Sequence, residues 1–152
     1  MHDDDDALEE EILTEEEQIL AERASSEEDR LAAAGLIQTV GQLPVLRPPI
    51  ACERSTAVRG AIEIMQTEQI GFIVVVENER LVGMFTERDL LNKVAGQDVD
   101  IDAVQIDEIM TPDPESLGGD YELVYAINLI SVGGYRHIPI VDDEGRPVNV
   151  VS

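Results

Sequence analysis

Three side chains in the string FTERD have the types and spacing to contact a sugar phosphate. Asp89 follows Thr86 by three residues, at the point where an apolar strand pattern gives way to a helix. At such a solvent-facing helix start, the Asp89 carboxylate can accept both hydroxyl protons of a ribose. The Thr86 hydroxyl can donate to a phosphate or ribose oxygen, and Arg88 can make a forked contact with phosphate. The alternative is a helix capped by Thr86, in which Asp89 only favours the helix dipole.

Other side chains with reactive groups are few. Arg136 and His137 adjoin, so either this pair attracts an anion or His137 begins a buried strand and bonds to backbone. Cys52 is the only cysteine, which excludes an internal disulfide, and we expect it to be a small buried hydrophobe. His2 lies far from His137 in the sequence, so a metal site is not expected. Because no carboxylate pair stands out as acid and base, we expect no catalytic residues and no enzymatic activity.

The charge of the chain limits its partners. Its 152 residues include 10 basic and 33 acidic side chains, a formal net charge of −23. Phosphate backbones and anionic membrane surfaces repel such a chain, so we expect it to bind neither nucleic acid nor membrane. No apolar run approaches the ~20 residues of a membrane-spanning helix, and the initial MHDDDD lacks the features of a secretory signal. We therefore expect a cytoplasmic protein.

The first 30 residues differ in composition from the rest, because they carry fourteen acidic and two basic residues. Ser25 and Glu28 are spaced as a capping box, which predicts a helix that runs through Val40 and ends before Pro44. We interpret residues 1–42 as an acidic, partly helical arm. This arm is either solvated or docked on a partner chain.

An internal repeat organises the remainder of the chain. Agreement in residue class and periodicity extends over most of a 45-residue unit, which indicates two copies of one structural unit. A residue inserted in a turn changes the offset from 65 to 66. Matched pairs include Val58 with Leu123, Ala61 with Ala126, Ile73 with Ile138, Val76 with Val141, and Phe85 with Val151.

Each unit has the pattern strand, helix, strand, strand, helix. Apolar residues at positions i, i+3, i+4 and i+7 predict helices over 58–65 and 123–130. Dense β-branched runs predict central strands over 73–76 and 138–141. A strand over 81–85 then leads, in the first unit only, to a final helix.

That final helix is predicted to begin at Thr86 and to have an apolar face of Leu90, Leu91 and Val94. The second unit stops at Ser152, and we expect it to be truncated before its own last helix. The predicted domains are therefore a first repeat over 43–97, a linker over 98–105 and a second repeat over 106–152.

These residues resemble a known family. The strings LVGMFTERDLL in the first unit, and EIMTPDPESL with GGYRHIPIVDDEGRP in the second, are similar to those of tandem cystathionine-β-synthase (CBS) domains. Such a pair is also called a Bateman module, here of the stand-alone bacterial type, and the resemblance covers residues 43–152. It implies an α+β fold of two βαββα repeats packed by pseudo-twofold symmetry, with two clefts.

The resemblance also implies which residues line the clefts. One cleft takes its Thr and Asp from the first repeat, namely Thr86 and Asp89 with Arg88, and its adenine-facing wall from the second. It implies that Arg136 and His137 lie near phosphates. The residues implied for that second wall are Met110, Pro114, Tyr135, Arg136 and His137.

The second cleft is expected to be defective. Its ribose-binding Asp would lie three residues beyond Ser152, and Asn149 stands where the family often has glycine. Glu115 is a further departure, because we expect it on a strand that faces the nucleotide, where a carboxylate would oppose phosphate. The residues implied for the second cleft are Ile50, Ile70, Gly71 and Ser152.

Two functions follow from the resemblance. The first is a regulatory module that senses an adenosine compound, such as AMP, ADP, ATP or S-adenosylmethionine, and transmits its binding to an unknown regulated protein as a change in repeat or dimer geometry. The second is a homodimerisation or interaction module with empty clefts. In either case we expect a homodimer through the helices over 58–65 and 123–130.

Overall fold

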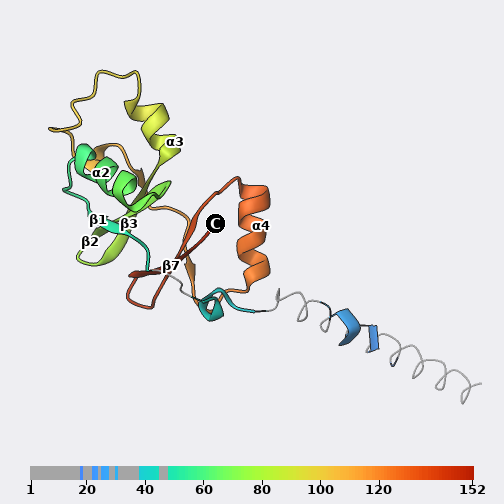
Figure 1. Cartoon of the computed structure of the whole chain (residues 1–152). Coiled ribbons are helices and arrows are strands. Elements are labelled where there is room, and N and C mark those ends of the chain that lie inside the picture. Colours follow the sequence, from blue (N-terminus) through green and yellow to red (C-terminus); the bar gives the residue numbers. More distant parts are fainter. Residues whose placement is uncertain (1–17, 19–21, 24, 28–29, 31–37, 45–47) are drawn as a thin grey trace, which may run out of the picture.

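The structure, a computed structural model, contains two similar units and part of the segment that precedes them (Figure 1). The seven described residues that precede Gln38 are helical. The helix predicted from Ser25 crosses 28–29 and 31–37, which lie outside the described residues, and its extension to Val40 is wrong, because Thr39 is extended and Val40 begins a separate 3-10 turn. No helix among the described residues is long and apolar enough to cross a bilayer. The structure describes residues 18, 22–23, 25–27, 30, 38–44 and 48–152.

The first repeat is built on a four-stranded sheet in the order β1-β2-β3-β4. Strand β1 is parallel to β2, and the remaining neighbours are antiparallel. Helix α2 (Val58–Glu68) connects β1 to β2. The strands are β1 (Ala51–Glu53), β2 (Phe72–Glu77), β3 (Arg80–Thr86) and β4 (Thr111–Pro112).

The second repeat repeats this plan with three strands in the order β5-β6-β7. Helix α4 (Leu123–Gly133) connects β5 to the parallel strand β6, and β7 is antiparallel to β6. Gly134 ends α4 in the left-handed conformation with φ 73°, as expected of a helix-ending glycine. The strands are β5 (Leu117–Gly118), β6 (Ile138–Val141) and β7 (Pro147–Val151).

The two sheets agree in register, which confirms the predicted repeat. Val75 pairs with Gly83 as Ile140 pairs with Asn149. The antiparallel ladder shifts register after Val75 in the first repeat and after Ile140 in the second. The predicted strands over 73–76 and 138–141 are therefore corresponding central strands, flanked in both repeats by a parallel and an antiparallel neighbour.

The predicted helical periodicity reflects burial against each sheet. Helix α2 buries Val58, Ala61 and Met65 against a first core that contains Ile73 and Phe85. A smaller second core forms around α4 and β6, from Val40, Leu117, Ala126, Ile138 and Ile140.

Each repeat receives a short segment from the chain that precedes the other. The Leu123 N–H, at the start of α4, donates to the Gln38 carbonyl at 2.8 Å, and the Val58 N–H, at the start of α2, donates to the Val104 carbonyl at 3.0 Å. The first N–H groups of a helix have no partner within it, so these carbonyls satisfy them. The contacts are equivalent under the repeat, and they place each connecting segment on the repeat that it does not precede.

The cores confirm this exchange. Val40 lies in the 3-10 helix η1 (Val40–Gln42) and is fully buried in the second core, although we assigned it to the arm. Ile106, in the 3-10 helix η3 (Ile106–Glu108), is fully buried in the first core, although we assigned it to the second repeat. The structural units therefore interlock at both predicted boundaries.

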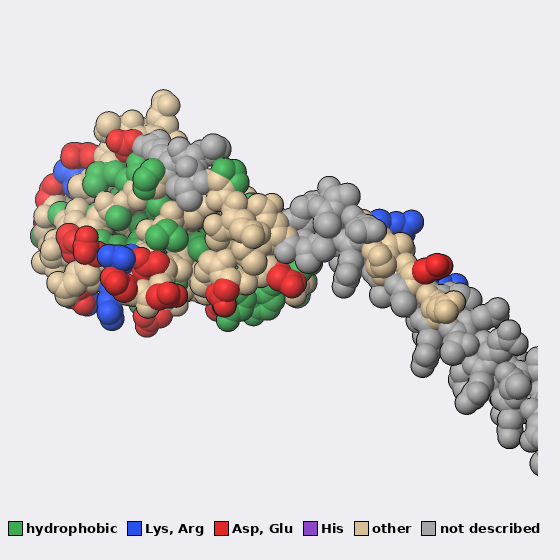
Figure 2. Space-filling view, turned by 90° about the horizontal axis from the view of Figure 1, so that it is seen from below, with side chains coloured by type: hydrophobic (Ala, Val, Ile, Leu, Met, Phe, Trp, Pro, Cys, Tyr) green, Lys and Arg blue, Asp and Glu red, His purple; other side chains and the backbone are tan. Residues whose placement is uncertain are grey.

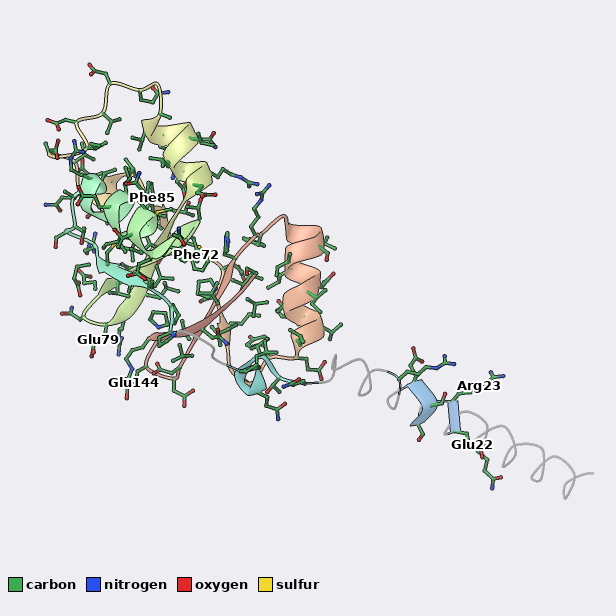
Figure 3. All side chains as sticks on the ribbon, in the orientation of Figure 1. Glu22, Arg23, Phe72, Glu79, Phe85 and Glu144 are labelled. Atoms are coloured by element: carbon green, nitrogen blue, oxygen red, sulfur yellow. The ribbon has the colours of Figure 1, made fainter. Side chains whose placement is uncertain are left out.

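The two β-hairpins also meet. Glu79 and Glu144 lie in equivalent turns that come close together in Figure 3. The Leu81 N–H donates to the Gly145 carbonyl at 2.9 Å, which joins the turn of the first repeat to that of the second.

The final helix of the first repeat differs from its prediction. After Thr86 the chain forms one α-helical turn, α3 (Glu87–Asp89), and continues as a π-helical turn, η2 (Leu90–Val94). Leu90 and Val94 pack on the first core, as predicted, but Leu91 is 67% exposed. The assignment of Leu91 to the apolar face is wrong, because the π turn changes the angular spacing of successive side chains.

Because the cores interlock, we expect Ile106→Ala to destabilise the fold strongly. Truncating a fully buried isoleucine should lower the free energy of unfolding by about 2–5 kcal/mol. Leu91→Ala is the matched control, and it should change that free energy by less than about 0.5 kcal/mol, because Leu91 is exposed. Urea denaturation followed by circular dichroism measures both. A loss for Ile106→Ala no larger than that of the control would contradict the exchange of segments.

Candidate functional site

A pocket of about 420 Å³ lies between the two repeats. Its first wall comes from the end of β3 and from α3, and its second wall comes from the segment after β4 and the loop between α4 and β6. Both repeats are therefore needed to form it. The residues that line it include Gly71, Met84, Thr86, Glu87, Arg88, Asp89, Thr111, Asp113, Pro114, Glu115, Gly134, Tyr135, Arg136 and His137.

Most residues predicted for the first cleft come together here. Thr86, Arg88 and Asp89 lie on the first wall, and Pro114 with the loop residues Tyr135, Arg136 and His137 lies on the second. Met110 does not line the pocket. Its side chain is buried against Gly83, where an added Cβ would collide with the Met110 sulfur.

The Asp89 carboxylate is buried, with 8% of the residue exposed, so the expectation that it faces solvent is wrong. The Thr86 N–H and hydroxyl donate to its Oδ2 at 3.0 and 2.9 Å. The Thr111 hydroxyl donates to Oδ1 at 3.1 Å, and the Lys93 ammonium contacts the same oxygen at 2.8 Å. A carboxylate has about four acceptor sites, so these contacts fill its capacity.

These contacts also determine the charge of Asp89. Burial raises the pKa of Asp89, but hydrogen bonds from Lys93 and Thr86 outweigh burial, so the pKa lies below its ordinary value. The Asp89 N–H in turn donates to the Thr86 hydroxyl oxygen at 3.3 Å. The capping interpretation is therefore confirmed as local structure, and the carboxylate is ionised at neutral pH.

The basic side chains of the pocket come from both repeats. Among the described residues, neither Arg88 nor Arg136 forms an ion pair, and both are exposed. The His137 ring packs on Phe72 with ring centroids 4.3 Å apart. Burial and the Arg136 charge lower the pKa of His137 from its ordinary value, while Glu87 opposes them, so His137 is neutral at pH 7.

Carboxylates balance these guanidinium groups. Glu87, Asp113 and Glu115 line the pocket in addition to the paired Asp89. Glu115 lies in the connection between β4 and β5, not on a strand as we expected. Acidic side chains are also spread over the face of the molecule in Figure 2. The pocket thus offers an anion two free guanidinium groups within an acidic surround.

The second predicted cleft is smaller. Ile50 and Ile70 line a cavity of about 180 Å³, together with Phe72 and Asn149. Ser152 does not line it, and Gly71 lines the larger pocket instead. Asn149 thus lies in this cleft, where we expected its side chain to reduce the space.

Two polar contacts at the site were not predicted from the sequence. Thr111 and Lys93 both reach Asp89, and the available sequence signal for Lys93 was its position four residues after Asp89. Within the described part of the chain, no group of three or more His, Cys, Asp or Glu side chains is arranged to hold a metal ion.

Comparison with known proteins places this geometry in context. The family model described as CBS domain matches residues 31–96 and 106–152. The CBS domain-containing protein CBSCBSPB5 of Arabidopsis thaliana is 31% identical over 91 residues, which cover 60% of this chain and 16% of that protein. The chain therefore spans a small part of the length of this relative.

Solved structures share the fold. A CBS domain protein of Pyrobaculum aerophilum in complex with AMP has a TM-score of 0.67 at 24% identity, covering 75% of this chain and 86% of that one. The CBS domain pair of protein MJ0100, with 5′-methylthioadenosine and S-adenosyl-L-methionine, has a TM-score of 0.65 at 25% identity, covering 76% and 90%. With its repeated register and two matched segments, the chain belongs to the CBS domain family, as a tandem pair of CBS repeats.

Proposed function

We propose that this chain is a regulatory module that binds an adenosine nucleotide in the 420 Å³ pocket between its repeats. One observation carries the proposal: the Thr86–Asp89 pair of the first repeat faces the same pocket as Tyr135 and Arg136 of the second. A hydroxyl and a carboxylate suit a ribose, and an unpaired guanidinium suits a phosphate. Related CBS pairs hold AMP, or methylthioadenosine and S-adenosylmethionine, which supports an adenosine compound as the ligand class.

Ribose binding in this pocket requires an exchange of hydrogen bonds. Because four donors already occupy the Asp89 carboxylate, a ribose hydroxyl has to replace at least one of them. The Thr86 hydroxyl is suited to leave, because it can then donate to the ligand. The Thr86 N–H and the Lys93 ammonium remain as anchors.

The phosphate end of the ligand is limited by charge. Arg88 and Arg136 match the charge of one phosphate group, whereas the carboxylates of Glu87, Asp113 and Glu115 repel additional phosphates. The pocket therefore favours a monophosphate such as AMP over ATP.

The output of binding is a change in geometry. Ligand contacts to both walls favour one relative position of the repeats over others, and a regulated protein responds to that position. We propose this regulatory role in place of catalysis, because the pocket combines a capped carboxylate with groups suited to recognition.

Replacing Asp89 tests the ribose contact. Asp89→Asn keeps the size of the side chain but removes the charge that strengthens hydrogen bonds from the ribose, so AMP affinity should fall at least about tenfold. Asp102→Asn is the matched control, because Asp102 is exposed and pairs with Arg59 outside the pocket. Isothermal titration calorimetry measures both affinities. Unchanged AMP affinity in a folded Asp89→Asn variant would remove this assignment.

Replacing Arg136 tests the phosphate contact. Arg136→Ala should lower the affinity for AMP by about tenfold and leave the affinity for adenosine nearly unchanged, because only AMP has a phosphate for the guanidinium to bind. Arg80→Ala removes the same charge from a residue outside the pocket and serves as control. Equal weakening of AMP and adenosine in calorimetric titrations would argue against a phosphate-binding Arg136.

The second candidate function is homodimerisation, and the surface of α4 favours it. Helix α4 has no charged residue, and Val124, Tyr125, Ile127 and Val132 are exposed large hydrophobic side chains on it. Helix α2 carries several charged residues, including Arg59, which pairs with Asp102. We therefore propose α4, more than α2, as the dimer surface, with a second copy of this chain as its partner.

A charge on α4 tests this association. Ile127→Glu should convert the dimer to a monomer, because a buried unpaired carboxylate opposes the contact. Leu91→Glu introduces the same charge at another exposed apolar residue and should leave the dimer intact. Multi-angle light scattering gives the mass of each. A monomeric parent chain at high micromolar concentration would exclude this role.

A further inference from the structure

Lys93 is the only lysine of the chain, and its ammonium group is fully engaged. It contacts the Asp89 Oδ1 atom at 2.8 Å and donates to the carbonyls of Ile109 and Met110 at 2.8 and 3.3 Å. An ammonium has three protons to donate, so these three acceptors account for all of them. Lys93 does not line the pocket, and any effect on a ligand would pass through the groups that it holds.

The π turn η2 positions this lysine. The Ala95 N–H donates to the Leu90 carbonyl at 2.8 Å, which closes the wider turn. Lys93 follows Asp89 by four residues, and within this turn its ammonium points toward the chain that leaves the first core. Single π turns are rare and occur frequently at functional sites.

The carbonyls that Lys93 contacts belong to the connection between the repeats. Met110 is buried in the first core, and the chain continues from it through β4 to Asp113, Pro114 and Glu115 on the second wall of the pocket. Thr111, the first residue of β4, donates to the same Asp89 oxygen that Lys93 contacts. One carboxylate oxygen therefore connects the first wall, through two donors, to the segment that becomes the second wall.

We propose that Lys93 is a positioning residue for the ligand site. It holds the Asp89 carboxylate and the 109–111 segment as one unit. The effect of ligand binding at Asp89 is thereby transmitted to the segment between the repeats. This inference rests on the proposed function and specifies how the ligand contact reaches the rest of the molecule. A purely structural Lys93 would instead affect stability and leave the affinity of the folded protein unchanged.

Three variants of the whole chain, titrated calorimetrically with AMP, distinguish these roles. Lys93→Met keeps the aliphatic stem without the charge. It should lower the affinity for AMP at least about tenfold, because the Asp89 carboxylate loses its anchor. Lys93→Arg restores a cationic donor and should recover most of the affinity. Arg80→Met removes one positive charge outside the pocket and should bind as the parent does.

The outcomes separate the two proposals. If the parent binds AMP and folded Lys93→Met binds it equally well, the positioning role is overturned and the proposed function stands. If Lys93→Met and Lys93→Arg both bind AMP equally weakly, the positioning role is also overturned, because a cationic donor then fails to restore AMP affinity. If the parent binds no adenosine compound, both proposals fail.

A second measurement applies if Lys93→Met does not fold. Because the chain has one lysine, acetylation of the parent by an N-hydroxysuccinimide ester has one side-chain amine target, and the amino terminus provides an internal reference. AMP should slow acetylation of Lys93 relative to the amino terminus, since a ligand on Asp89 holds the ammonium in place. Mass spectrometry of peptides gives both rates. An unchanged ratio at saturating AMP would overturn the proposal.

Discussion

The interlocking of the two repeats is the constraint on which the remaining structure depends. Each repeat helix begins with an N–H group whose acceptor is a carbonyl from the segment preceding the other repeat, Gln38 for α4 and Val104 for α2. Each core is completed in the same way, by Val40 in the second and Ile106 in the first. Separating the repeats would expose these apolar side chains and leave helix termini without partners.

This constraint also determines where the pocket lies. The segment after Ile106 is fixed in the first core by Met110 and in the second core by Leu117. Between these two anchors it passes the Asp89 carboxylate and supplies one wall of the pocket. The ligand that we propose for this pocket would contact the part of the chain that both repeats hold, and a small displacement there would affect the packing of both.

The buried Asp89 carboxylate is the polar centre of the proposed site. Leaving a charge with incomplete hydrogen bonding inside a protein is costly, and here four donors compensate for burial. In the function that we propose, a ligand that binds Asp89 has to displace one of these internal donors, so binding requires rearrangement around Asp89. Sensing would then follow from replacing one complete set of hydrogen bonds to the Asp89 carboxylate by another.

The sequence allowed the repeat, the main helices and the strands to be predicted, because periodic burial repeats at a nearly constant offset. The pairing of Val75 and Ile140 with equivalent partners follows from that offset. The placement of Met110 was wrong because Gly83 leaves room for its side chain inside the first core, a contact between distant residues.

The burial and pairing of Asp89 depend on tertiary contacts as well. The burial of Asp89 was missed because one of its donors, Thr111, lies in the other repeat's leading segment, and another, Lys93, is positioned by a π turn. The offset of the repeats does not encode such a turn. Residue type and local spacing indicated which groups could bind a sugar phosphate, whereas their internal partners required the fold.

A crystal structure of the chain grown with AMP tests the central claim most directly. The account predicts AMP in the pocket between the repeats, with ribose hydroxyls within hydrogen-bond distance of the Asp89 carboxylate and the phosphate on Arg136. It also predicts that at least one of the donors now on Asp89, the Thr86 hydroxyl first, has turned away. AMP bound only in the smaller cleft at Ile50 and Ile70, or an empty pocket at saturating AMP, would contradict the account.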